Sequence, residues 1–192
     1  MARPHYEEGQ ERARDRIVAA FWTALEERPY DKVTVKLVTD LAGVNKNTFY
    51  YHFETMDDLA KEAVRDAFSQ LPIEKLLAGD DYFGAVTALI REGRVSPSKI
   101  QLIGHDGSGR LTRMLEDVAM AFFASRASID PTKLTLHDHI IIRALLSAIL
   151  SFAREATPES FLERFSVLYH SKLAQGGIEE VRAIVARTRL DA

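Results

Sequence analysis

A run of hydrogen-bond donors near the N-terminus is the clearest chemical signal in the sequence. Residues 45 to 52 carry amide, ammonium, hydroxyl and imidazole groups and no carboxylate: Asn45, Lys46, Asn47, Thr48, Tyr50, Tyr51 and His52. Amide and ammonium groups can read base edges in the DNA major groove, whereas tyrosine hydroxyls reach phosphate oxygens and set the register. Donors without carboxylates suit a polyanion, so this segment predicts a contact with nucleic acid.

Other groups with possible chemistry are weaker candidates. His137 and His139 flank Asp138, but at helical spacing they point about 200° apart and cannot share one metal ion. The loop from Gly104 to Gly109 follows no strand and lacks the lysine of a phosphate-binding loop, which favours a turn between helices. Cysteine is absent, and no serine, histidine and acid combination has a nucleophile setting. We therefore predict no enzyme, no metal site and no cofactor, and the sequence assigns no cofactor-binding residue.

Short helices must position the donor run. Thr34 is a predicted N-cap of a helix that ends at Gly43, where a left-handed residue is expected. Asn45 is the predicted cap of the next helix, Lys46 to Tyr51, which is too short to be stable alone. Two short helices joined by a four-residue turn, with a longer helix on each side, are typical of a helix-turn-helix.

The flanking helices have their own signals. Residues 11 to 28 carry an apolar stripe that includes Phe21 and Trp22, both predicted to be core, and Pro29 ends the pattern. Thr55 with Asp58 is a capping-box-like start for a fourth helix, expected over residues 55–70. Arg12, Arg14 and Arg16 are candidates for an N-terminal arm on DNA.

The rest of the chain also predicts helices. Apolar residues recur at intervals of three and four, and the one β-branched alternation, residues 33–35, is too short for a strand. We expect nine or ten helices, a break at Gly176-Gly177 and a last helix from Ile178 to Arg189. The predicted fold class is all-α, with a helix-turn-helix DNA-binding domain at 1–53, a helical effector-binding and dimerisation domain at 54–192, and the helix at 55–70 as connector.

Residues 12 to 60 resemble the DNA-binding domain of the TetR family of transcriptional regulators. The most diagnostic part is the run Thr48-Phe49-Tyr50-Tyr51-His52-Phe53. The resemblance implies that Phe49 and Phe53 are core. It implies contacts to phosphate or base edges from Thr34 and Lys36, to the groove from Asn45, Lys46, Asn47 and Thr48, and to phosphates from Tyr50, Tyr51 and His52. The loop from Gly104 to Arg110 resembles the C-terminal domain of a subgroup related to dihydroxyacetone-kinase regulators.

Two features depart from the family pattern. Met56 stands where the family usually has a lysine, and we expect the adjacent Asp57 and Asp58 to be unopposed. Residues 1 to 60 hold 8 basic and 11 acidic side chains, a net charge of -3, whereas a basic domain is the usual footprint of DNA binding. These departures support an alternative, a helical protein-interaction module or co-regulator with weakened DNA binding.

The resemblance implies a ligand-responsive repressor that binds a palindromic double-stranded operator as a homodimer and responds to a small-molecule effector. Broad apolar coverage of residues 136–155 and 158–175 indicates a dimer interface there, with a buried central helix in a monomer as the alternative. The most apolar run, Ile140 to Ala153, is shorter than the roughly 20 residues that a membrane span needs. We therefore expect no membrane contact and a cytoplasmic location.

Overall fold

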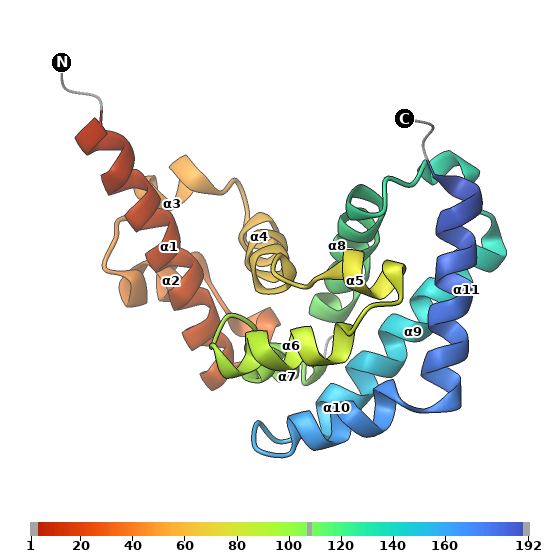
Figure 1. Cartoon of the computed structure of the whole chain (residues 1–192). Helices are drawn as coiled ribbons and strands as arrows, with labels where there is room; N and C mark the ends of the chain where they lie inside the picture. The colour runs from red at the N-terminus through yellow and green to blue at the C-terminus, as the bar shows by residue number, and fades with distance from the viewer. Residues whose placement is uncertain (1–3, 107–108, 190–192) are drawn as a thin grey trace.

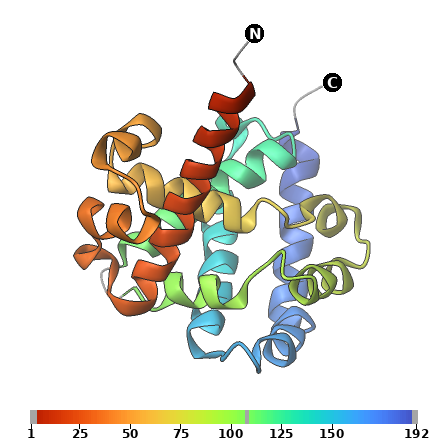
Figure 2. The ribbon, with the colours of Figure 1, turned by 90° about the vertical axis from the view of Figure 1, so that its left-hand side faces the viewer.

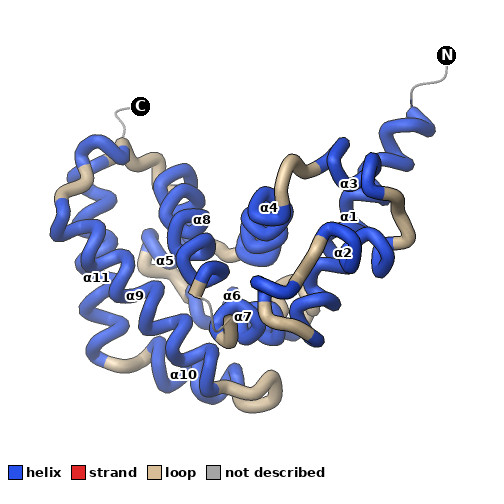
Figure 3. The backbone as a smooth tube through the Cα atoms, turned by 180° about the vertical axis from the view of Figure 1, so that it is seen from behind, coloured by secondary structure: helices blue, strands red, loops and turns tan. Residues whose placement is uncertain are grey.

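The computed structural model describes residues 4–106 and 109–189, with side chains from Arg12 onward except Ala153. Within these ranges the regular elements are all helices, as Figure 3 shows, and the predicted all-α fold class is confirmed. The α-helices, labelled in Figure 1, are α1 (Pro4–Glu27), α2 (Val35–Ala42), α3 (Lys46–His52), α4 (Met56–Phe68), α5 (Ile73–Ala78), α6 (Tyr82–Arg91), α7 (Pro97–Gly104), α8 (Arg110–Arg126), α9 (Leu136–Glu155), α10 (Phe161–Tyr169) and α11 (Lys172–Thr188). Two 3-10 helices, η1 (Tyr30–Lys32) and η2 (Pro131–Lys133), join them.

The predicted helix caps are confirmed. The Thr34 side chain accepts a hydrogen bond from the Leu37 amide, and Gly43 ends α2 in the left-handed region at φ 62°. Asn45 caps α3 by accepting from the Thr48 amide. Thr55 and Asp58 form a reciprocal capping box at the start of α4. These short-range bonds satisfy backbone groups that a helix end leaves unpaired, so they set where the short helices begin.

Two predictions about the later helices were wrong. The described residues hold eleven α-helices rather than nine or ten, because the six-residue α5 is too short to leave a periodic pattern. The predicted break at Gly176-Gly177 is absent, since α11 begins at Lys172 and runs through both glycines. A Cβ atom at Gly177 would lie 2.4 Å from the Leu145 Cδ2 atom of α9, so this glycine serves close helix packing rather than helix termination.

A continuous apolar core joins the N-terminal helices to the helices that follow. It begins with Ile17 and Phe21 of α1, includes Phe49 of α3 and Leu59 of α4, and continues into Leu111 of α8. Figures 1 and 2 show α4 beside α1, and Figure 1 shows α8 on the other side of α4. The helix-turn-helix therefore rests on the C-terminal helices (α5 to α11) through α4 and through a contact of α1 with α7, where the Lys99 ammonium lies over the Trp22 ring.

The C-terminal helices have smaller apolar clusters of their own. Phe83 of α6 stacks on Phe165 and Tyr169 of α10, with ring centroids 5.4 and 5.7 Å apart. Leu136 and Ile140 of α9 stay exposed. No helix in the described ranges combines the length and apolar character that crossing a bilayer requires.

Candidate nucleic-acid interface

Helix α3 is anchored by one fully buried aromatic side chain. Phe49 has no exposed surface, and its ring lies 5.8 Å from that of Phe53, which is also buried. The expectation that both are core is confirmed. Because a seven-residue helix has little stability of its own, this burial and the Asn45 cap hold α3 in place. The recognition-type helix is therefore mounted rigidly on α1 and α2.

The opposite side of α3 presents donors to the outside. Lys46 and Asn47 are exposed in its first turn. Tyr50 and Tyr51 are 56% and 66% exposed, which is unusual for aromatic side chains next to a core. Thr48 is half-buried between these groups. Four of the predicted site residues thus share one accessible surface, hereafter the donor face (Lys46, Asn47, Tyr50 and Tyr51).

The capping residues Asn45 and Thr34 already accept hydrogen bonds within the helices that they cap. The Asn45 Oδ1 atom accepts bonds from the Thr48 amide at 2.8 Å and from the Thr48 hydroxyl at 3.1 Å. The Thr34 Oγ1 atom accepts from the Leu37 amide at 3.2 Å. Each cap uses an oxygen, so the Asn45 amide group and the Thr34 hydroxyl hydrogen can still donate outward. The helix N-termini that they cap also favour an anion.

Lys36 has a carboxylate partner one turn along α2. Its ammonium group donates to Asp40 at 2.6 Å, and both side chains are mostly exposed. An exposed pair at this spacing contributes only a few tenths of a kcal/mol, roughly 0.3 to 0.5. A phosphate could therefore replace Asp40 at little cost, although the pair reduces the net positive charge at this position.

His52 is turned partly into the molecule. Its Nε2 atom is buried and has no hydrogen-bond partner among the described residues, and its ring packs edge-on against Tyr51 at 5.0 Å. Burial, together with the charge of Arg14, lowers the pKa of His52 below its ordinary value of 6.5. The imidazole is therefore neutral near pH 7. This arrangement offers DNA no Nε2 donor from His52.

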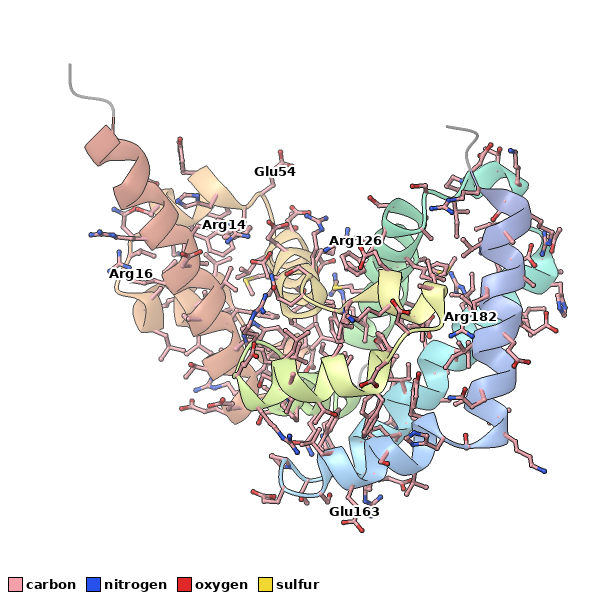
Figure 4. All side chains as sticks on the ribbon, in the orientation of Figure 1. Arg14, Arg16, Glu54, Arg126, Glu163 and Arg182 are labelled. Atoms are coloured by element: carbon pink, nitrogen blue, oxygen red, sulfur yellow. The ribbon has the colours of Figure 1, made fainter. Side chains whose placement is uncertain are left out.

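Arg14 is tied to α4. Its guanidinium donates to Glu62 at 2.7 Å and to Asp66 at 2.9 Å, and Figure 4 shows the side chain between α1 and α4. The hydrogen bond to Glu62 raises the pKa of Arg14 above its usual range, against the effect of burial. In Figure 4 Arg16 points away from α4, and both Arg16 and Arg12 are exposed. Of the three candidate arm residues, Arg14 instead fastens α1 to α4.

The expectation that Asp57 and Asp58 are unopposed was wrong. Asp58 completes the capping box with Thr55. Asp57 accepts hydrogen bonds from the Tyr30 hydroxyl at 2.6 Å and from Arg110 at 2.5 Å. Sequence reasoning missed Tyr30 and Arg110, because partners 27 and 53 residues away produce no local pattern.

The other candidate sites gain no support from side-chain geometry. Asp138 is fully buried and accepts hydrogen bonds from Thr135 and Arg187, whereas His137 is exposed. The described part of the chain contains no group of three potential metal ligands. In the loop that begins at Gly104, Gly107 and Ser108 lie outside the described residues.

Comparison with known proteins agrees with the geometry of the N-terminal helices. Residues 17–63 match the family described as "Bacterial regulatory proteins, tetR family". No curated protein matches the chain. Among solved structures, the chain is similar to a TetR transcriptional regulator from Rhodococcus sp. RHA1, with 17% identity, coverage of 92% of this chain and 96% of that chain, and a TM-score of 0.41. The matched residues run from α1 through the donor face into α4, so the similarity to the tetR family covers the helix-turn-helix and most of the helix that follows it.

Proposed function

We propose that the protein is a ligand-responsive transcriptional repressor that binds a palindromic DNA operator as a homodimer in the cytoplasm. The observation that carries the proposal is the donor face, four exposed donor side chains on a short helix anchored by Phe49. A helix of this kind can enter the major groove, where its N-terminal side chains meet base edges. We place the functional boundary near residue 53, with α4 as the connector.

The residues of the interface divide into two roles in this proposal. Lys46 and Asn47 stand in the first turn of α3 and read base edges, with Asn45 and Thr48 at the margin of the groove. Tyr50 and Tyr51 donate to phosphates, as do Thr34 and, after exchange of Asp40, Lys36. His52 packs against Tyr51 and makes the least direct contribution to DNA binding.

Exposed apolar side chains support the homodimer. Leu136 and Ile140 of α9 are 77% and 55% exposed, and Val167 of α10 and Leu173 of α11 are 72% and 75% exposed. Burial against a second copy would remove this surface from water. Two recognition helices related by a two-fold axis would then read the two halves of a palindrome. The proposal assigns no residue to the effector site.

The test is selection of bound fragments from the source genome by the purified protein, followed by titration of the best fragment at two salt concentrations. Enrichment of a palindrome with half-sites one helical turn apart supports the regulator. Lys46→Ala should lower operator affinity by about 1 to 3 kcal/mol and relax the preference at the base that Lys46 reads. Tyr51→Phe should lower affinity roughly tenfold by removing one hydrogen bond to a charged group.

Lys75→Ala is the matched control, because Lys75 is an exposed lysine in α5, outside the donor face and outside the helices proposed for dimerisation. It should leave operator affinity unchanged. If no fragment is enriched even at low salt, the second candidate takes over, the protein-interaction module that the acidic balance of residues 1 to 60 favours. Binding of a protein partner with an affinity that does not depend on salt would then support this second function.

A further inference from the structure

One contact joins three separate elements beside the first turn of α4. The Tyr30 hydroxyl donates to one oxygen of Asp57 at 2.6 Å, and Arg110 donates to the other at 2.5 Å. The Arg110 guanidinium also lies over the Tyr30 ring, 5.6 Å from its centre. Asp57 is therefore held on both oxygens, and Arg110 contacts both other members. We call Tyr30, Asp57 and Arg110 the junction triad.

The elements of the junction triad belong to different parts of the protein. Tyr30 lies in η1, between α1 and α2, and its buried ring packs edge-on against Phe21 at 6.2 Å. Asp57 lies in the first turn of α4. Arg110 is the first residue of α8, which packs against α4, α7 and α9. The triad thus links the helix-turn-helix to a helix embedded among the C-terminal helices.

Local helix stability does not explain Arg110. A cation in the first turn is unfavourable for its own helix, because the positive end of the helix dipole lies there. The carboxylate of Asp106, which precedes α8 and accepts from the Leu111 amide at 2.9 Å, offsets part of this effect. Asp57, by contrast, stands favourably in the first turn of α4. The hydrogen bond to Asp57 and the contact with the Tyr30 ring therefore give Arg110 a role between elements in addition to its place in α8.

The junction triad adds a directed contact at one end of the packing between α4 and α8, and at the other end Arg126 of α8 donates to the Ser69 carbonyl at the end of α4 at 3.1 Å. The packing of α4 on α8 is part of the continuous core, where hydrophobic attraction acts without a fixed direction and interdigitating side chains allow a small range of crossing angles. Hydrogen bonds to both oxygens of one carboxylate restrict the angle between donor and acceptor. The residues of the triad line an open pocket of about 360 Å³ together with Met56. The contact therefore lies at the surface, where its hydrogen bonds can break and form again.

We propose that Arg110 is a positioning residue for DNA binding. By holding Asp57 and Tyr30, it sets the angle of the helix-turn-helix relative to α8, and a displacement of α8 would change operator affinity through this contact. The inference rests on the proposed function and names the side chains through which the C-terminal helices act on the donor face. Arg110 itself need not touch DNA.

The first experiment is a double-mutant cycle in operator binding with the full chain. Arg110→Gln and Asp57→Asn should each lower affinity about 5- to 20-fold, and the double variant should lose no more than either alone. Arg110→Lys should restore part of the loss. The salt dependence should stay that of the wild type, because no phosphate contact is removed. The thermal unfolding midpoint of Arg110→Gln should also change little, because the Arg110 side chain is 53% exposed and an exposed ion pair contributes little stability.

Arg113→Gln is the matched control, since Arg113 is an exposed arginine one turn further along α8. It should bind like the wild type. A smaller salt dependence in Arg110→Gln would show that Arg110 contacts a phosphate and would overturn the positioning role. Additive losses in the double variant, or no loss at all, would overturn it as well.

A second measurement separates this inference from the proposed function. The chain has no cysteine, so Ala19→Cys and Ala121→Cys, both at exposed positions, allow two spin labels on α1 and α8. The distance distribution should broaden or shift in Arg110→Gln and Asp57→Asn but not in Arg113→Gln. If the wild type binds no DNA, the proposed function fails while this comparison still decides whether the triad sets the angle. An unchanged distribution in both triad variants would refute the inference.

Discussion

Asp57 places a negative charge close to the helix-turn-helix, and two donors from other elements offset it. Burial opposes its ionisation, but the hydrogen bonds from Tyr30 and Arg110 bring the pKa of Asp57 below its ordinary value of 3.8. Burial and the hydrogen bond to Asp57 raise the pKa of Tyr30 above its ordinary value of 10.0. The junction triad therefore holds an ionised carboxylate and a neutral phenol over a wide pH range.

A pH dependence of stability follows for Asp57. Because its folded pKa is depressed, its contribution to the free energy of unfolding is fully present above the unfolded carboxyl pKa, about 3.9, and is lost as pH falls through the folded value. The difference in unfolding free energy between the wild type and Asp57→Asn should shrink below about pH 4. Urea unfolding from pH 7 to pH 3 measures it. Asp80→Asn, in an exposed loop, is the control, and a constant difference would contradict the assignment.

At the scale of elements, the turn between α2 and α3 depends on backbone conformation as much as on packing. Gly43 ends α2 at φ 62°, and no other atom lies within 4 Å of the position that a Cβ would take. The site is therefore spacious but left-handed, so conformation rather than size requires glycine. This turn sets the angle between α2 and the donor face.

Gly43→Ala should destabilise the protein by about 1 kcal/mol, because alanine is strained in the left-handed region. Gly43→Asn should cost less, since asparagine tolerates this conformation better. Chemical unfolding of both variants checks the order. Equal stability of the alanine variant and the wild type would mean that the turn relaxes away from φ 62°.

The adjacent glycines of α11 offer a matched pair with opposite expected signs. Gly176 has no neighbour within 4 Å, so Gly176→Ala should stabilise the helix by about 0.5 to 1 kcal/mol. Gly177→Ala would bring a Cβ to 2.4 Å from Leu145 and should destabilise by about 1 to 2 kcal/mol. Thermal or urea unfolding measures both. If both variants changed stability in the same direction, α9 and α11 would not pack closely at Gly177.

In the whole molecule, one continuous core includes residues on both sides of the proposed boundary near residue 53. Phe49 and Leu59 share it with Leu111, so α3 and α4 are not packed independently of α8. The ion pairs of Arg14 with Glu62 and Asp66 bind α1 to α4 in the same region. The donor face and α8 are therefore connected through the packing of α4.

A substitution at the exposed Ile140 of α9 tests the proposed dimer. Ile140→Lys should weaken self-association, because Ile140 is 55% exposed in the single chain and a lysine there would have to lose its hydration on dimerisation. Circular dichroism should show unchanged helix content, and sedimentation equilibrium should show a shift toward monomer. Ala183→Lys, at an exposed position of α11, is the comparison. A dimer of wild-type strength in Ile140→Lys would place the interface elsewhere.

Local interactions made the helix-turn-helix predictable from the sequence alone. Caps such as Thr34, Asn45 and the Thr55 and Asp58 box act over three residues, and the family resemblance of the run from Thr48 to Phe53 implied the core position of Phe49. Only the tertiary structure decided which groups meet across the chain: Arg110 with Asp57, 53 residues apart, Arg14 with Glu62, 48 apart, and Gly177 against Leu145. The physical reason is that a cap is selected by its own neighbours along the chain, whereas these partners are set by how the helices pack.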